Sequence, residues 1–151
     1  MPVRELEAHR GSVLFDLSGV AHGEWAAPAW DAEFLLRLGD GGEFDLTLVP
    51  DGDRPVRLHL DESGLLLARV GGGLAGVPGY ETENRAPIRV RPDGTLALRI
   101  LRDKCSLEIF IGEGETALYC FTMTDPGDHR CEFACSSESI LIRSHAWSIN
   151  R

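Results

Sequence analysis

Residues 95–123, TLALRILRDKCSLEIFIGEGETALYCFTM, decide the fold class of this 151-residue chain. Apolar side chains recur at every second position in two runs, Leu96, Leu98 and Ile100, then Leu107, Ile109 and Ile111. This period of two is typical of strands that bury one face and leave the other in water. Strands of this kind occur in antiparallel sheets. The glycines at 112 and 114 mark a turn before a third alternating segment.

The same alternation occurs in residues 44–48 and 56–60. Turn-forming residues separate the segments roughly every 8 to 15 residues, which is the spacing of sandwiches and barrels. Residues 70–87 are rich in glycine and proline, so we expect a long surface loop there. No helix-length periodicity separates the strands, which excludes a parallel βαβ sheet. We therefore predict an all-β fold of two packed antiparallel sheets, with a closed barrel as the alternative.

The N-terminal residues predict a different element. Pro2 suits a first helical turn, Glu5 and Glu7 lie near the positive end of such a helix, and Gly11 provides a stop. We expect a short linker helix in residues 1–11, followed by one β-sandwich domain in residues 12–151.

Composition excludes several function classes. The net charge of −9 repels phosphate backbones and anionic lipids, so we expect neither nucleic acid nor membrane as a partner. No apolar stretch approaches the roughly 20 residues of a membrane span. The first residues lack the apolar core of a secretory signal, so we expect a cytoplasmic location.

The four cysteines, Cys105, Cys120, Cys131 and Cys135, lack a CxxC spacing, and we expect them to be reduced and mostly buried. An even count leaves a disulfide open. His129, Cys131 and Cys135 together could ligate a soft metal. A fourth ligand is absent, and Cys131 and Cys135 also alternate as one face of a strand, so we predict no metal and no cofactor.

The stretch at 95–123 resembles the hairpin in the C-terminal domain of glycoside hydrolase family 32, the β-fructosidases that include invertase and sucrose-6-phosphate hydrolase. Six residues match the family pattern in order: Asp103, Lys104, Ser106, Glu108, Phe110 and Gly114. Residues 2–6 resemble the linker from the catalytic propeller, and Trp147 lies near the closing aromatic strand. The family usually has serine at the position of Cys105 and asparagine near Gly112. The resemblance implies a concanavalin-like jelly roll.

In that family, a retaining pair of carboxylates cleaves fructosides from a five-bladed propeller. The propeller segments W-M-N-D-P-N-G, R-D-P and E-C are missing from this chain, and a propeller needs roughly 200 residues at about 40 per blade. The resemblance therefore implies a non-catalytic C-terminal module of a β-fructofuranosidase, similar to sucrose-6-phosphate hydrolase. It would support the propeller, its main partner, and contribute to a homodimer. Sucrose, sucrose-6-phosphate and fructan stay open as substrates of the parent enzyme.

Two alternatives remain at this stage. One is a carbohydrate-binding module for fructan or sucrose, in which Trp25, Trp30 and Trp147 would stack on a weakly bound sugar. Core or interdomain packing is the interpretation we favour for these three rings. The other alternative is a hydrolase site built from Glu24, Asp31 or Glu108, but we predict no catalytic residue in this chain.

Overall fold

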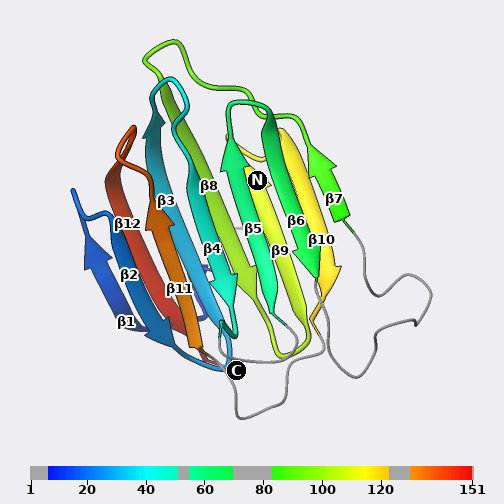
Figure 1. Cartoon of the computed structure of the whole chain (residues 1–151). Coiled ribbons are helices and arrows are strands. Elements are labelled where there is room, and N and C mark those ends of the chain that lie inside the picture. The colour runs from blue at the N-terminus through cyan, green and yellow to red at the C-terminus, as the bar shows by residue number, and fades with distance from the viewer. Residues whose placement is uncertain (1–6, 51–54, 70–82, 123–129, 151) are drawn as a thin grey trace.

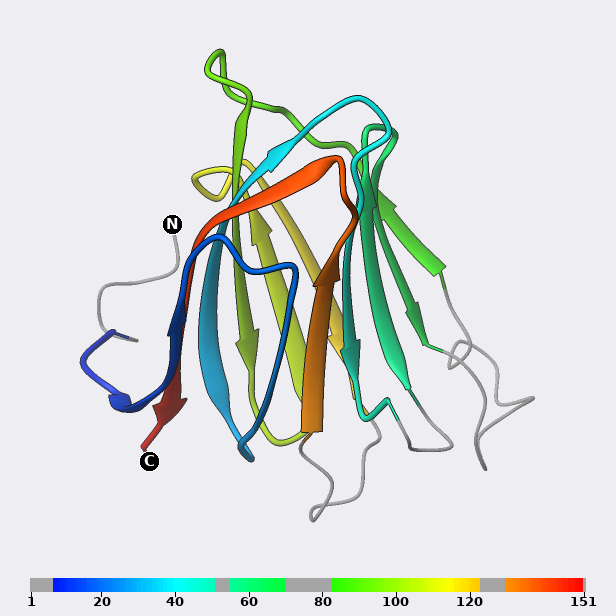
Figure 2. The same cartoon turned by 60° about the vertical axis from the view of Figure 1, so that its left-hand side comes forward.

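The computed structural model describes residues 7–50, 55–69, 83–122 and 130–150. They form two six-stranded antiparallel sheets packed face to face (Figures 1 and 2). Sheet A has the spatial order β1 (Arg10–Leu17), β12 (Ser139–Ile149), β3 (Trp30–Leu38), β8 (Thr95–Arg102), β9 (Ser106–Ile111) and β10 (Thr116–Phe121). Sheet B has the order β2 (His22–Ala26), β11 (Arg130–Cys135), β4 (Phe44–Leu48), β5 (Val56–Asp61), β6 (Gly64–Arg69) and β7 (Glu83–Ala86). The predicted two-sheet β-sandwich is confirmed.

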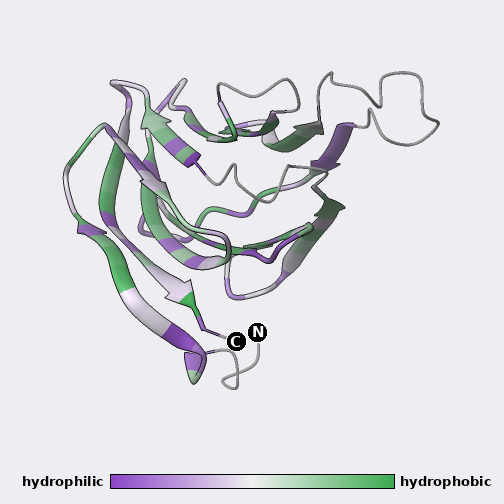
Figure 3. Ribbon diagram, turned by 90° about the horizontal axis from the view of Figure 1, so that it is seen from below, coloured by the Kyte–Doolittle hydropathy of each residue, from purple (hydrophilic) through white to green (hydrophobic). Residues whose placement is uncertain are grey.

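The interior lies between the two sheets and follows the predicted alternation. Seen from below in Figure 3, the layers curve around a shared core, and hydrophobic and hydrophilic residues alternate along the strands. One half of the core is aromatic, with Phe34 contacting Phe44 and Phe133 at ring-centroid distances of 5.1 and 5.4 Å. The other half is filled by buried leucines and isoleucines of β5, β6, β8 and β9. Each such side chain contributes about 1.5–3 kcal/mol to folding.

Residues 95–121 form the meander β8–β9–β10, as predicted, and Met123 lies outside the described residues. The turn between β9 and β10 requires two glycines in the left-handed region of φ, Gly112 at 69° and Gly114 at 91°. A side chain at either position would strain the backbone. The β8–β9 connection is closed by the amide of Asp103, which donates to the carbonyl of Ser106 at 3.0 Å.

Two local predictions need correction. The described residues do not support the linker helix, because Arg10 already pairs with Ile149 as the start of β1. The amide of Asn150 donates to the carbonyl of His9 at 3.0 Å, so this segment bonds to the strand beside it. Residues 1–6 of the predicted helix lie outside the described residues.

The long loop predicted for residues 70–87 is wrong at 83–86, which form β7. Residues 70–82 of that predicted loop lie outside the described part of the chain.

None of the four cysteines, all of which lie in the described residues, forms a disulfide. Cys120 and Cys131 are buried, Cys135 is partly buried and Cys105 is exposed. Cys131 shares the inward face of β11 with Phe133, as the alternation indicated. No helix in the described residues is long and apolar enough to cross a membrane.

Candidate functional site

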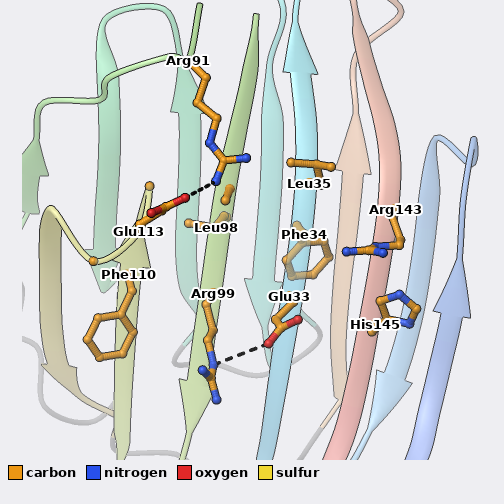
Figure 4. Close-up of a pocket in the computed structure, with 13 residues that line it drawn as sticks. Glu33, Phe34, Leu35, Arg91, Leu98, Arg99, Phe110, Glu113, Arg143 and His145 are labelled. Carbon is orange, nitrogen blue, oxygen red and sulfur yellow. Dashed lines mark hydrogen bonds and ion pairs between the residues drawn. The ribbon is translucent and has the colours of Figure 1, made fainter. Parts of the chain in front are cut away.

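The outward faces of the two sheets differ in chemistry. Sheet B turns charged and polar side chains outward, among them Glu24, Asp45, His59 and Glu132. Sheet A turns apolar as well as charged side chains outward, and a groove of about 440 Å³ lies across β12, β3, β8 and β9 (Figure 4). The outer face of sheet A is therefore the candidate functional surface.

Part of the lining of this groove is apolar. Leu35, Ala97 and Phe110 come from three neighbouring strands and are each only partly buried. Register places Leu35 opposite Ala97 and Arg99 opposite Phe110, so these side chains share one face of the sheet. Apolar side chains at outward positions are the reverse of what a solvated sheet face requires.

The borders of the groove are rich in arginine. Figure 4 shows Arg91 joined to Glu113 at one end and Arg99 joined to Glu33 at the other, at 3.2 and 3.9 Å. Arg143 also lines the groove; it is exposed and has no ion pair among the described residues. With three arginines against two glutamates, the groove is locally basic on a chain whose net charge is −9.

Beside the groove lies an ion cluster centred on Asp31, which is 1% exposed although it sits on the outward side of β3. The guanidinium of Arg99 donates to both of its oxygens, and Nε of Arg10 donates to Oδ2 at 2.7 Å. Arg10 also donates to Glu33. Burial lowers the pKa of Arg10, but the hydrogen bonds to Asp31 and Glu33 outweigh it, so the pKa is raised above its ordinary value. The guanidinium of Arg10 therefore stays charged.

The apolar strip continues from Phe110 onto β10. Register places Ala117 opposite Phe110 and Tyr119 opposite Glu108. Tyr119 and Phe121 are 49% and 56% exposed, and their rings meet edge to face at 5.1 Å. These two exposed aromatic rings extend the apolar part of this face to the edge of the sheet.

The three tryptophans do not form a platform. Trp25 and Trp30 project from opposite sheets into the core, where they are 7% and 0% exposed and meet edge to face at 5.1 Å. They have no ring face free for a sugar. Trp147 lies on the outer face of sheet A, with the guanidinium of Arg10 3.7 Å from its ring centroid and His145 stacked at 5.6 Å. Interdomain contact through Trp147 remains a prediction.

The acidic residues considered for a hydrolase site lie apart from one another. Glu24 is on the outer face of sheet B, opposite Glu132. Glu108 is on the outer face of sheet A, and Asp31 is already bound by Arg10 and Arg99. This arrangement does not place two free carboxylates on either side of one glycosidic bond.

No group of three metal-ligating side chains occurs in the part of the chain that the structure describes. His129 lies outside the described residues. Burial raises the pKa of the Cys135 thiol to about 11 and raises that of Cys131 as well. Both thiols are therefore protonated at neutral pH in the metal-free domain.

The residues that carry the family resemblance are placed by the meander. Asp103 shapes the β8–β9 turn, where its Oδ1 accepts from the amide of Lys104 at 2.6 Å, and Ser106 begins β9. Glu108 and Phe110 point outward from β9, and Gly114 lies in the next turn. Arg10, Arg99 and Arg143 were not predicted from the sequence to form this surface. The apolar Phe110, Tyr119 and Phe121 at the otherwise polar positions of residues 95–123 were the signal that could have found this face.

A family model described as glycosyl hydrolases family 32 C terminal matches residues 29–147. The fold is similar to that of exo-inulinase from Aspergillus awamori (TM-score 0.80, 14% identity, 96% of this chain and 31% of that chain). It is also similar to that of sucrose-6-phosphate hydrolase from Lactobacillus gasseri (TM-score 0.75, 19% identity, 99% of this chain and 30% of that chain). A third similar structure is galectin LEC-6 from Caenorhabditis elegans (TM-score 0.62, 12% identity, 87% of this chain and 94% of that chain). None of the curated proteins compared with the sequence matches it.

These likenesses to solved structures, all below 20% identity, show the fold. The chain spans about a third of the length of the two glycoside hydrolases that it matches. The family model covers most of the chain. Because that match extends from the residue before β3 to Trp147 in β12, the chain belongs to the family of C-terminal domains of family 32 glycosyl hydrolases.

Proposed function

We propose that this chain is a non-catalytic β-sandwich that packs against the catalytic β-propeller of a family 32 glycoside hydrolase and stabilises it. The contact surface is the outer face of sheet A. The observation that carries this proposal is the contrast between the two outward faces: sheet B carries mostly charged and polar side chains, and sheet A holds a basic groove lined in part by Leu35 and Phe110.

The N-terminal end of the described chain lies over the same face. Glu7 pairs with Arg99 at 3.7 Å, and Arg10 is held between Trp147 and Asp31. A domain joined ahead of residue 7 would leave the sandwich on the side of sheet A. The outer face of sheet A would then be its nearest surface.

The parent enzyme that we propose is a β-fructofuranosidase acting on sucrose, sucrose-6-phosphate or fructan, because the similar structures include an exo-inulinase and a sucrose-6-phosphate hydrolase. In this proposal the chain alone does not hydrolyse these sugars, since both carboxylates of a retaining pair would lie on the propeller. A sucrose hydrolysis assay on the purified chain tests this point: turnover above the buffer rate would contradict it. The cytoplasmic location stays a prediction, which fractionation of the native host would test.

The docking proposal is tested by co-expressing this chain with the family 32 propeller of the same genome and measuring the affinity of the complex. Phe110→Ser and Arg143→Glu should weaken binding at least tenfold, because the first removes an aromatic ring from the groove lining and the second reverses one of its charges. Leu66→Ser, a partly buried leucine on the outer face of sheet B, is the matched control and should leave the affinity unchanged. Equal weakening by all three variants would contradict docking through sheet A.

Carbohydrate binding by the isolated domain is the weaker candidate, because Trp25 and Trp30 are buried. Calorimetric titration with inulin, levan and sucrose should show no heat of binding at millimolar sugar. Saturable binding would make the domain a carbohydrate-binding module in its own right.

A further inference from the structure

The charged side chains that point outward from the strands of sheet A differ in whether the domain itself supplies their counter-charge. Most form ion pairs within the face, among them Arg10 and Arg99 with Asp31. The others have no ion pair among the described residues; they are Arg37, Arg143 and Glu108. A charge that is covered by another domain without a counter-charge is costly, so these positions state what a partner surface must provide.

The outward position of Arg143 is built into the backbone of β12. Leu141 pairs with Leu36, but Arg143 pairs with the next residue of β3, Leu35, so β12 has one extra residue at this point. Leu141 faces the core at 1% exposure, and regular alternation would turn Arg143 inward as well. The bulge reverses this phase and turns the exposed guanidinium outward. Figure 4 shows Arg143 extending from β12 towards β3.

Glu108 lies at the opposite corner of the face, beside a second cavity of about 400 Å³. Register places Glu108 opposite Leu101, which is 7% exposed although it points away from the core. Ile149, which is partly buried, forms another part of the cavity wall. The cavity thus combines apolar walls with a partly buried carboxylate that has no ion pair among the described residues.

The two unpaired charges are far apart. Arg143 lies in the same row of the sheet as Ala97, and Glu108 lies in the same row as Leu101, four residues along β8. With about 3.3 Å per residue and about 4.8 Å between strands, Arg143 on β12 and Glu108 on β9 are roughly 20 Å apart. This exceeds the Debye length of about 8 Å at physiological salt, so each charge acts on its own part of a partner.

We propose that these charges orient the docked propeller: it places a carboxylate against Arg143 and inserts a lysine or arginine side chain into the cavity beside Glu108. This inference rests on the docking proposed above and specifies the chemistry of the partner surface. With opposite charges at two corners of the face, a propeller turned by half a turn would place like charges together at both.

The cavity suits a long basic side chain for a physical reason. Lysine and arginine have aliphatic stems that pack on apolar surface while the charged head reaches a polar group. Leu101 and Ile149 provide that surface, and the carboxylate of Glu108 would accept from the head. A short or acidic side chain would leave either the apolar walls or the carboxylate without a contact.

Charge reversal in the complex of this chain with the family 32 propeller of the same genome tests the two positions. Glu108→Lys and Arg143→Glu should each weaken binding at least tenfold, and their effects should multiply in the double variant because the sites are far apart. Glu24→Lys and Arg57→Glu make the same reversals at exposed positions on the outer face of sheet B and should leave the affinity unchanged. Circular dichroism and thermal unfolding show whether each variant folds.

The salt dependence of association gives a second readout. Raising the salt concentration from about 0.05 to about 0.5 M should slow association of the wild type, because salt screens the attraction at both corners. The double variant should lose this dependence or reverse it. Equal salt dependence in the wild type and the double variant would contradict the proposal.

A cross-link identifies the group that faces Arg143. Arg143→Lys keeps the charge and supplies an amine that a carbodiimide joins directly to a carboxylate. Mass spectrometry of the treated complex should find this lysine bonded to an aspartate or glutamate of the propeller, whereas Arg57→Lys on sheet B should give no such product.

The outcomes separate this inference from the docking proposal. A complex that forms but is insensitive to both reversals, or that gives no cross-link from Arg143→Lys, overturns the orienting charges and leaves docking in place. If no complex forms with the wild type, the docking proposal fails, and the inference that rests on it fails too.

Discussion

The carboxylate of Asp31 accepts two hydrogen bonds from the guanidinium of Arg99, at 2.9 and 2.8 Å. The two residues are 68 positions apart in the sequence, on the neighbouring strands β3 and β8. Asp31 is almost fully buried on the outward side of its sheet, and Arg10 covers it from β1. The cluster thus ties three strands of sheet A together at the surface where we propose that another domain docks.

Asp31→Asn should destabilise the domain by ~3 kcal/mol, because it leaves two partly buried guanidinium groups without their carboxylate. Chemical denaturation of the purified chain measures this change. Glu24→Gln is the matched control; its side chain is 69% exposed, and the change should stay within about 0.5 kcal/mol. Similar losses for the two variants would show that the cluster contributes nothing to stability.

Phe34→Ala should cost about 3–5 kcal/mol, since Phe34 is 2% exposed and contacts Phe44 and Phe133 across the sandwich. Thermal and denaturant unfolding measure the loss. Ile140→Ala removes an exposed side chain from β12 of the same sheet and should change stability little. A mild effect of Phe34→Ala would contradict the packing described for the aromatic half of the core.

His59 should make stability depend on pH. Its Nδ1 lies 2.7 Å from Asp45, and this hydrogen bond, opposed by burial and helped by the charges of Asp45, Asp61 and Glu43, raises the pKa of His59. The protonated ring therefore stabilises the fold fully below the ordinary pKa of about 6.5, and that stabilisation is lost as the pH rises through the raised value.

The free energy of unfolding of His59→Gln should consequently fall furthest below that of the wild type in acid. The difference in the free energy of unfolding between the wild type and His59→Gln should become smaller at alkaline pH. His22→Gln is the control, because His22 is exposed and has no ion pair among the described residues. A constant gap between wild type and His59→Gln from about pH 5 to about pH 9 would contradict the assignment.

Thiol reactivity should separate the four cysteines. Cys105 is exposed and should react rapidly with a disulfide reagent at about pH 8, where burial keeps Cys131 and Cys135 protonated. Cys105→Ser should abolish the fast phase, and denaturant should release the three remaining thiols. A fast phase that persists in Cys105→Ser would show that the interior near β11 opens readily.

Local alternation was sufficient to predict the strands of the meander and the sandwich as a whole. Leu96, Leu98 and Ile100 cannot all be buried unless the segment is extended and packed on one side. The N-terminal residues were harder to predict, because Pro2 and Gly11 are local helix signals, whereas Arg10 is held in β1 by contacts with β12 and Asp31. Tertiary hydrogen bonds outweighed a local preference there.

The amino-acid sequence by itself determined which side chains face inward on most strands. Successive side chains of a strand point to opposite faces, so this pattern depends only on neighbouring residues. Only the tertiary structure decided what the outward side chains meet. Arg99 meets Asp31, and Tyr119 lies on an edge strand of the described sheet, because strand order brings distant segments together and sets which strands lie at the edges. The same physics buried Trp25 and Trp30: their side chains enter from opposite sheets and meet only once the sandwich closes.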